Sequence, residues 1–209
     1  MTGRILSSDA CMAEGAAWLA EAEPRFAHAL QITGPPPLRR RPDGFAALLQ
    51  AIVSQQVSVA AAAAIWGRMG AAGLTAPESV AVADDYTLRT AGLSRQKVRY
   101  ARALATAGID FDALRAMPDA EVVSTLIEVP GIGRWTAEIY AMFSLGRADV
   151  FAPADLALQE SARVLFELPD RPREAALRRM ADAWSPWRTV AAGQLWAYYH
   201  VLTSREGVL

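Results

Sequence analysis

Two glycines, Gly131 and Gly133, follow Pro130 at a spacing that can build an anion-binding turn. Glycine permits positive φ and lets the backbone approach a ligand closely. A helix that begins just after them, at about Arg134, would present N–H groups beside the positive end of its dipole. This arrangement suits a DNA phosphate. Gly-x-Gly alone is a weak signal, because an ordinary turn between two helices uses glycines in the same way.

The residues around these glycines predict a helix, a tight turn and a second helix over about Leu126–Ala137. Pro130 disfavours α geometry in the residue before it, so the first helix is expected to end near Glu128. Ile132, between the two glycines, is expected to turn inward and fix the turn.

A single carboxylate, Asp155, lies in the segment Phe151–Gln159 just before a strong helical pattern. Ala154 precedes it, so Asp155 is the only aspartate in this loop after Asp149. A side-chain oxygen at this position can cap the following helix. On the residues alone, capping is the simpler interpretation of Asp155.

The composition excludes several classes of protein. Of the 209 residues, 53 % are hydrophobic and 21 % are charged, which is enough for a sizeable core and excludes whole-chain disorder. The single cysteine, Cys11, excludes a disulfide framework, an iron–sulfur cluster and a four-cysteine metal site. The N-terminus has no apolar signal segment, and no stretch approaches about 18 apolar residues. We therefore expect a cytoplasmic protein with no membrane partner. We further expect a monomer of bacterial type that is nucleoid-associated when bound to DNA.

The net charge is −1 and the pI is near 6.1, which argues mildly against nucleic-acid binding because a basic domain is its usual footprint. Lys97 is the only lysine among the 21 basic residues, and the others are arginines. Any binding to DNA would depend on local groups, and we expect it to weaken with salt.

Helical signals extend along nearly the whole chain. Apolar residues recur at three- and four-residue spacing, and no sustained alternation marks a sheet. We predict an all-α fold of about ten helices. Helix starts are predicted at caps or first-turn prolines, namely Asp9, Pro24, Asp43, Ser58, Pro77, Ser94, Asp119, Asp155 and Pro172.

Two breaks divide this helical pattern. Residues 34–44 contain prolines that cannot continue a helix, and residues 146–153 lie between two strong helical patterns. The sequence predicts a contiguous helical domain over 44–147 that contains the hairpin. The flanking segments, 1–43 and 148–209, are too short for separate cores. We expect them to form a second helical domain together, with an active-site cleft between the two domains.

The segment VPGIGRWTAEIYAMFSLGRADVFAPADLALQ resembles, in order and spacing, the hairpin and catalytic aspartate loop of the helix-hairpin-helix/Gly-Pro-Asp superfamily of DNA glycosylases. Within it, the closest resemblance is to the 3-methyladenine DNA glycosylase II group. Three further segments resemble that group's minor-groove segment, its C-terminal signature and a weaker motif, namely residues 51–59, residues 184–188 with 195–196, and residues 92–97. Four ordered motifs make the phosphate-binding interpretation of the hairpin the better one. The resemblance covers about residues 44–200.

The resemblance implies an enzyme that flips an alkylated base, such as 3-methyladenine, out of damaged double-stranded DNA and hydrolyses its N-glycosidic bond. It implies that Asp155 is the essential carboxylate, which stabilises the cationic sugar and orients or deprotonates the attacking water. Longer relatives often carry a second acidic residue where this chain has Ala154. Glu138 is the nearest acidic alternative, and we interpret it as a helix-face residue.

The resemblance also implies the binding residues. The expected DNA contacts are Gly131, Ile132, Gly133, Arg134, Thr136, Gln55 and Gln56. Gln56 would fill the gap left by the flipped base, although both glutamines could instead face solvent at a helix end. Trp135 and Trp196 are expected to wall the base pocket, where indole faces attract a cationic purine, but a core role is equally open for each. Tyr140 is a further pocket candidate.

The position two residues after the last hairpin glycine sets the subclass. Bifunctional relatives carry there a lysine that forms a Schiff base, whereas this chain has Trp135. The resemblance therefore implies base removal without AP-lyase activity. It implies no cofactor other than a structural monovalent cation at the hairpin carbonyls. Two alternatives stay open: a non-catalytic helix-hairpin-helix DNA-binding protein, and a glycosylase for deaminated or oxidised bases.

Overall fold

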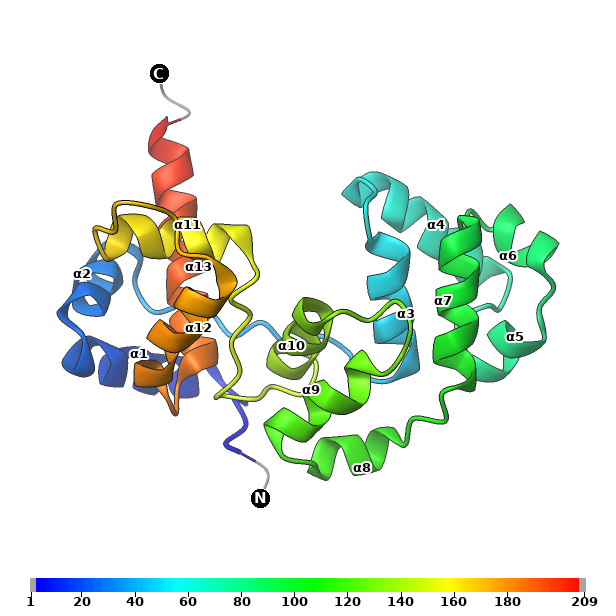
Figure 1. The fold of residues 1–209 in the computed structure, drawn as a ribbon, viewed down its shortest axis with the longest axis horizontal. Helices are drawn as coiled ribbons and strands as arrows, with labels where there is room; N and C mark the ends of the chain where they lie inside the picture. Colours follow the sequence, from blue (N-terminus) through cyan, green and yellow to red (C-terminus); the bar gives the residue numbers. More distant parts are fainter. Residues whose placement is uncertain (1–2, 207–209) are drawn as a thin grey trace. The chain divides into compact units, whose positions relative to one another are not determined.

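The computed structural model describes residues 3–206, and this part of the chain is all-α, as predicted (Figure 1). It contains thirteen α-helices and one 3-10 helix, and its only β pairing is an isolated bridge between Ile5 and Arg147. The chain forms two compact units, residues 41–140 and residues 3–40 together with the chain from 141 onward. Every helix in this part of the chain is too short or too polar to cross a bilayer.

The first unit is built around α7. Its helices are α3 (Phe45–Ser54), α4 (Val59–Ala71), α5 (Pro77–Val82), α6 (Asp85–Thr90), α7 (Arg95–Thr106), α8 (Phe111–Ala116), α9 (Asp119–Ile127) and most of α10 (Arg134–Phe143). Helix α7 packs against α3, α5 and α6. The apolar face of α3 is completely buried at Leu48, Leu49 and Ile52, so this helix and its C-terminal end have a fixed position within the unit.

The second unit is built around α13. Its helices are α1 (Asp9–Ala22), α2 (Pro24–Thr33), α11 (Leu156–Leu165), α12 (Glu174–Ala181), the 3-10 helix η1 (Asp182–Trp184) and α13 (Arg188–Glu206). Helix α13 packs against α1, α2 and α11. Phe26 meets Phe166 and Trp184 edge to face, with ring centroids 5.8 and 5.2 Å apart. Both ends of the chain thus contribute to one core.

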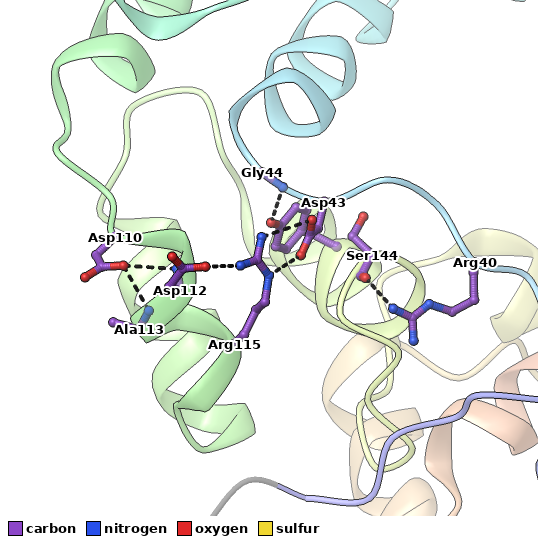
Figure 2. A network of polar contacts seen from close by, with 9 residues as sticks. Arg40, Asp43, Gly44, Asp110, Asp112, Ala113, Arg115 and Ser144 are labelled. Atoms are coloured by element: carbon purple, nitrogen blue, oxygen red, sulfur yellow. Dashed lines mark hydrogen bonds and ion pairs between the residues drawn. The ribbon is translucent and has the colours of Figure 1, made fainter.

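All nine predicted helix starts lie within two residues of an observed start. The start of α3 is displaced by two residues from Asp43, and the structure shows the reason. Asp43 was expected to start this helix, but its carboxylate pairs with the Arg115 guanidinium at 2.6 Å (Figure 2). Gly44, at φ 92°, takes the capping position instead. Arg115 also pairs with Asp112 in the same network.

The predicted helix starts omit three helices, namely the long α13 and the two short helices α6 and α8. Helices α6 and α8 have six residues each and are capped by Asp84 and Asp110. Fewer than two turns cannot display a 3.6-residue period, so only their caps could have marked them. The predicted domain boundaries at residues 44 and 147 also differ from the observed division at 41 and 140. The chain passes from one unit to the other inside α10, where no proline or glycine marks the change.

Candidate active site and DNA-binding hairpin

The turn between α9 and α10 has the expected inward anchor. Ile132 is 4 % exposed, and its N–H donates to the carbonyl of Val129 at 3.0 Å. The residues that follow, Gly133 and Arg134, are exposed. The turn therefore presents backbone and the first residue of α10 to solvent while its apolar side chain is buried, as an anion site at a helix N-terminus requires.

The two hairpin glycines have different roles. Gly131 has φ +96°, and a Cβ there would lie 2.4 Å from the Tyr100 ring, so both backbone and packing demand glycine. Gly133 has no positive φ, and a Cβ there would meet no atom within 4 Å. Gly131 thus serves the fold, whereas the space above Gly133 is open to a ligand.

The segment after α3 lies beside the hairpin. The side-chain Nε2 of Gln55 donates to the carbonyl of Gly131 at 2.9 Å. Gln56 is exposed and has φ 55°, a left-handed conformation that costs a non-glycine residue about 1–3 kcal/mol. Strain of this kind persists where the surroundings impose it, often at functional sites. The structure therefore brings the two predicted DNA-contact segments together.

Two residues that the sequence reasoning did not assign to the site brace these segments from α7. The Nζ of Lys97 donates to the carbonyl of Val53 at 2.7 Å, and burial lowers the pKa of this amine. Tyr100 packs on Gly131. An open groove of about 550 Å³ lies between this part of α7, the turn after α3 and the hairpin glycines. The motif at residues 92–97 was the signal that could have pointed to Lys97.

Three other predicted residues lie on α10. Trp135 is 44 % exposed, whereas Thr136 and Tyr140 are buried. The Tyr140 hydroxyl accepts a 2.8 Å hydrogen bond from the Gly44 N–H, and burial raises the pKa of this phenol to about 12. The structure thus gives Tyr140 a role in fixing the start of α3.

In the second unit, Asp155 is the N-cap of α11. Its Oδ1 accepts hydrogen bonds from the N–H groups of Ala157 at 3.0 Å and Leu158 at 3.1 Å. The indole Nε1 of Trp196 donates to the same oxygen at 3.3 Å. Asp155 as a whole residue is half-buried. Asp155 therefore caps α11 and also contacts Trp196, which was predicted to wall the base pocket.

An ion pair anchors the loop that leads to Asp155. Arg188, at the start of α13, donates to both carboxylate oxygens of Asp149, at 2.8 and 2.9 Å, and Ser185 adds a bond of 2.8 Å. Burial raises the pKa of Asp149, but these hydrogen bonds outweigh it, so the net pKa lies below its usual range. A bidentate arginine–carboxylate pair has a well-defined geometry. The loop is therefore held to α13.

Buried hydrogen bonds complete the attachment of this loop. The Thr189 hydroxyl contacts the carbonyls of Arg147 and Val150 at 2.6 and 2.8 Å. The Gln159 amide donates to the carbonyl of Pro153 at 2.8 Å. Sequence reasoning did not find these contacts, because each joins residues from different segments through side chains common in any helix.

Trp196 is partly buried against Phe143, with ring centroids 5.6 Å apart and planes inclined by 33°. These two rings also line a cavity of about 30 Å³ with residues 36–38. That volume holds about one water molecule and is too small for a base. Among the residues the structure describes, no group of three or more His, Cys, Asp or Glu side chains could hold a metal ion.

Comparisons with known proteins identify the family to which the chain is similar. The family model described as HhH-GPD superfamily base excision DNA repair protein matches residues 49–188. DNA-3-methyladenine glycosylase 1 of Schizosaccharomyces pombe is 31 % identical over 158 residues, which cover 71 % of this chain and 69 % of that protein.

Two solved structures are similar over most of their length. A DNA-3-methyladenine glycosidase from Bacillus halodurans has a TM-score of 0.81 and 32 % identity, and the match covers 95 % of this chain and 92 % of that one. The S. pombe 3-methyladenine DNA glycosylase in complex with abasic DNA has a TM-score of 0.75 and 27 % identity, with coverage of 88 % and 95 %. Since the family model spans the hairpin, the Asp155 loop and Arg188, the chain belongs to the HhH-GPD superfamily of base excision DNA repair proteins.

Proposed function

We propose that the protein is a monofunctional DNA glycosylase that removes alkylated, cationic bases such as 3-methyladenine from double-stranded DNA in base excision repair. The observation that carries the proposal is Asp155, a carboxylate fixed at the N-terminus of α11 and bonded to Trp196. The names of the similar proteins support the substrate class, and the abasic DNA bound to one of them is the product that base release leaves.

The chemistry requires the damaged nucleotide to leave the duplex, because its glycosidic bond is inaccessible in the stack. In the proposal, the N–H groups at the start of α10 hold a phosphate above Gly133, where the surface is open. Gln56, exposed on its strained turn, fills the space that the base leaves. The groups that would hold the phosphate and fill the gap in the duplex thus lie in one part of the first unit.

Bond cleavage gives the glycosidic electron pair to the departing base and leaves an oxocarbenium-like sugar. A base that is already cationic becomes neutral as it leaves, so it needs little help from a general acid. Asp155 stabilises the developing positive charge on the sugar, and orients or deprotonates the water that attacks C1′. One carboxylate is therefore sufficient for an alkylated substrate.

The absence of strand cleavage is part of the proposal. A lyase needs an amine that attacks C1′ and forms a Schiff base. Trp135 occupies the position where bifunctional relatives have that lysine. Lys97, the only lysine, donates to the carbonyl of Val53 at the end of α3. Both observations support hydrolysis as the sole chemistry.

A monovalent cation at the hairpin is also proposed, on the chemistry of its donors. The carbonyls of Val129 and Gly131 belong to the turn, although they already accept hydrogen bonds from Ile132 and Gln55. A carbonyl has a second lone pair, and neutral oxygen ligands suit a singly charged ion. Such an ion would reinforce the turn and attract the same phosphate.

Mass spectrometry of the bases freed from methylated duplex DNA tests this function. The wild-type protein should release 3-methyladenine, and Asp155→Asn should release none while still binding abasic duplex. Glu160→Gln is the matched control, because Glu160 lies on the same helix and pairs with Arg163 at 2.6 Å. If the protein binds DNA but frees no base from methylated, deaminated or oxidised duplexes, it is a non-catalytic binding protein.

A further inference from the structure

The carboxylate of Asp155 receives hydrogen bonds from two different helices. Two donors are the backbone N–H groups of Ala157 and Leu158, in the first turn of α11. The third is the indole Nε1 of Trp196, in α13, at 3.3 Å. All three reach Oδ1. The backbone donors would be present in any capped helix, whereas the indole is a separate feature of this chain.

The backbone donors alone do not fix the plane of the carboxylate. Both backbone donors belong to one helical turn and reach one oxygen, and the terminal torsion of aspartate is broad, so small rotations of the carboxylate remain possible. A third donor from a different helix restricts this rotation. It also stabilises negative charge, since hydrogen bonds to an ionised group are stronger than neutral ones.

The position of the indole is itself fixed by buried contacts. Ser161 of α11 is completely buried, and its hydroxyl donates to the carbonyl of Leu195 at 2.7 Å. Leu195 directly precedes Trp196, so this bond sets the register between α11 and α13 at the indole. Phe143 contacts the ring of Trp196 with centroids 5.6 Å apart. Trp196 therefore has little freedom to move away from Asp155.

We propose that Trp196 is a positioning residue, whose indole N–H fixes the carboxylate of Asp155 in the orientation that faces the reacting sugar and its attacking water. This inference rests on the proposed glycosylase function and deepens it. As a wall of the base pocket, Trp196 would need only its ring. As a positioning residue it also needs the indole N–H, so an experiment that removes the N–H and keeps the ring distinguishes the two roles.

Replacing Trp196 by benzothienylalanine makes this separation, because a sulfur takes the place of the indole N–H and the fused rings keep their shape. The matched control is natural tryptophan inserted at position 196 by the same suppression method. We expect the single-turnover rate of 3-methyladenine release to fall about tenfold or more, with the half-saturating concentration of the enzyme unchanged. An unchanged rate would overturn the inference, because the ring alone would then be sufficient.

The hydrogen bond can also be observed without turnover. In a ¹H–¹⁵N spectrum, the indole resonance of Trp196 is assigned by its loss in Trp196→Phe. Asp155→Asn should move this resonance more than the other indole resonances, and Glu160→Gln should leave it in place. Equal effects of the two substitutions would show that the indole does not bind the carboxylate and would overturn the inference.

The two experiments separate this inference from the proposed function. A wild-type protein that frees no base contradicts the glycosylase assignment, together with the catalytic consequence of the Trp196 contact. A wild-type protein that frees 3-methyladenine, with a benzothienylalanine variant that is equally fast, contradicts only the role of the N–H.

Discussion

The amide of Gln55 donates to the carbonyl of Gly131 at 2.9 Å, which joins the turn after α3 to the hairpin between α9 and α10. The residue next to Gln55 adopts a left-handed conformation, and the residue that accepts the bond is a glycine at φ +96°. Two unusual backbone conformations are thus coupled through one side chain.

Alanine at Gly131 should lower stability, whereas alanine at Gly133 should lower the affinity for DNA. Gly131→Ala should lower the free energy of unfolding by about 2 kcal/mol or more, because the methyl group would meet Tyr100 at a positive φ. Gly133→Ala should melt within a few degrees of the wild type yet bind abasic duplex more weakly, because its methyl group occupies the open side of the turn. Thermal melting and fluorescence anisotropy measure the two effects. Unaltered DNA affinity in a folded Gly133→Ala variant contradicts the phosphate site.

Substitutions of Gln56 should separate strain from function. Gln56→Ala removes the amide and keeps the cost of the left-handed backbone, whereas Gln56→Gly removes the amide and this cost. We expect the glycine variant to be more stable than the alanine variant by about 1 kcal/mol in urea denaturation. Both should release base more slowly than the wild type in duplex DNA, because neither can fill the gap. An alanine variant that is the more stable of the two would argue against strain at this residue.

The ion pair of Asp149 with Arg188 should make stability depend on pH in the acid range. The folded-state pKa of Asp149 is depressed, so its contribution is present above the unfolded pKa of about 3.9 and is lost as pH falls through the folded pKa. Asp149→Asn should cost about 2 kcal/mol at pH 7 and progressively less below about pH 4. Urea denaturation across this range measures the difference. A cost that does not change with pH would mean that the carboxylate charge contributes little.

Removing the hydroxyl of Tyr140 should affect folding and spare catalysis. Tyr140→Phe deletes the acceptor of the Gly44 N–H, so the free energy of unfolding should fall by about 1 kcal/mol. The rate of base release should stay within about twofold of the wild type, since the side chain is buried and its hydroxyl is occupied by the Gly44 N–H. A large drop in this rate with intact stability would restore Tyr140 to the base pocket.

Lys97 should not form a covalent intermediate. Its amine is held at the carbonyl of Val53. Borohydride added during incubation with abasic duplex should therefore trap no protein–DNA adduct. An adduct that forms with the wild type and disappears in Lys97→Met would identify a lyase and contradict the monofunctional assignment.

The sequence predicted the elements better than their connections. Ser58, Ser94 and Asp155 cap helices as expected, because a cap is a local interaction between residues two or three apart. The inward turn of Ile132 was also predictable from the glycines on either side of it. Helix caps and tight turns depend on residues close together in the chain, so short sequence patterns predict them.

The supports of the site were not predictable in the same way. The bond between Asp149 and Arg188 joins residues 39 apart, and that between Lys97 and Val53 joins residues 44 apart. Each partner alone resembles any charged residue on a helix or loop, and only the folded chain shows that they meet. For Asp155, the sequence offered a cap and a catalytic group as alternatives, whereas the structure shows a cap whose oxygen also binds Trp196.

The most direct test of the central claim is the single-turnover rate of 3-methyladenine release from methylated duplex by the wild-type protein and by Asp155→Asn, with abasic-DNA affinity measured in parallel. Our account predicts a loss of about a thousandfold or more in rate with similar affinity, because a neutral amide cannot stabilise the cationic sugar. Release by the variant within about tenfold of the wild type would contradict it, since Asp155 would then be only the cap of α11.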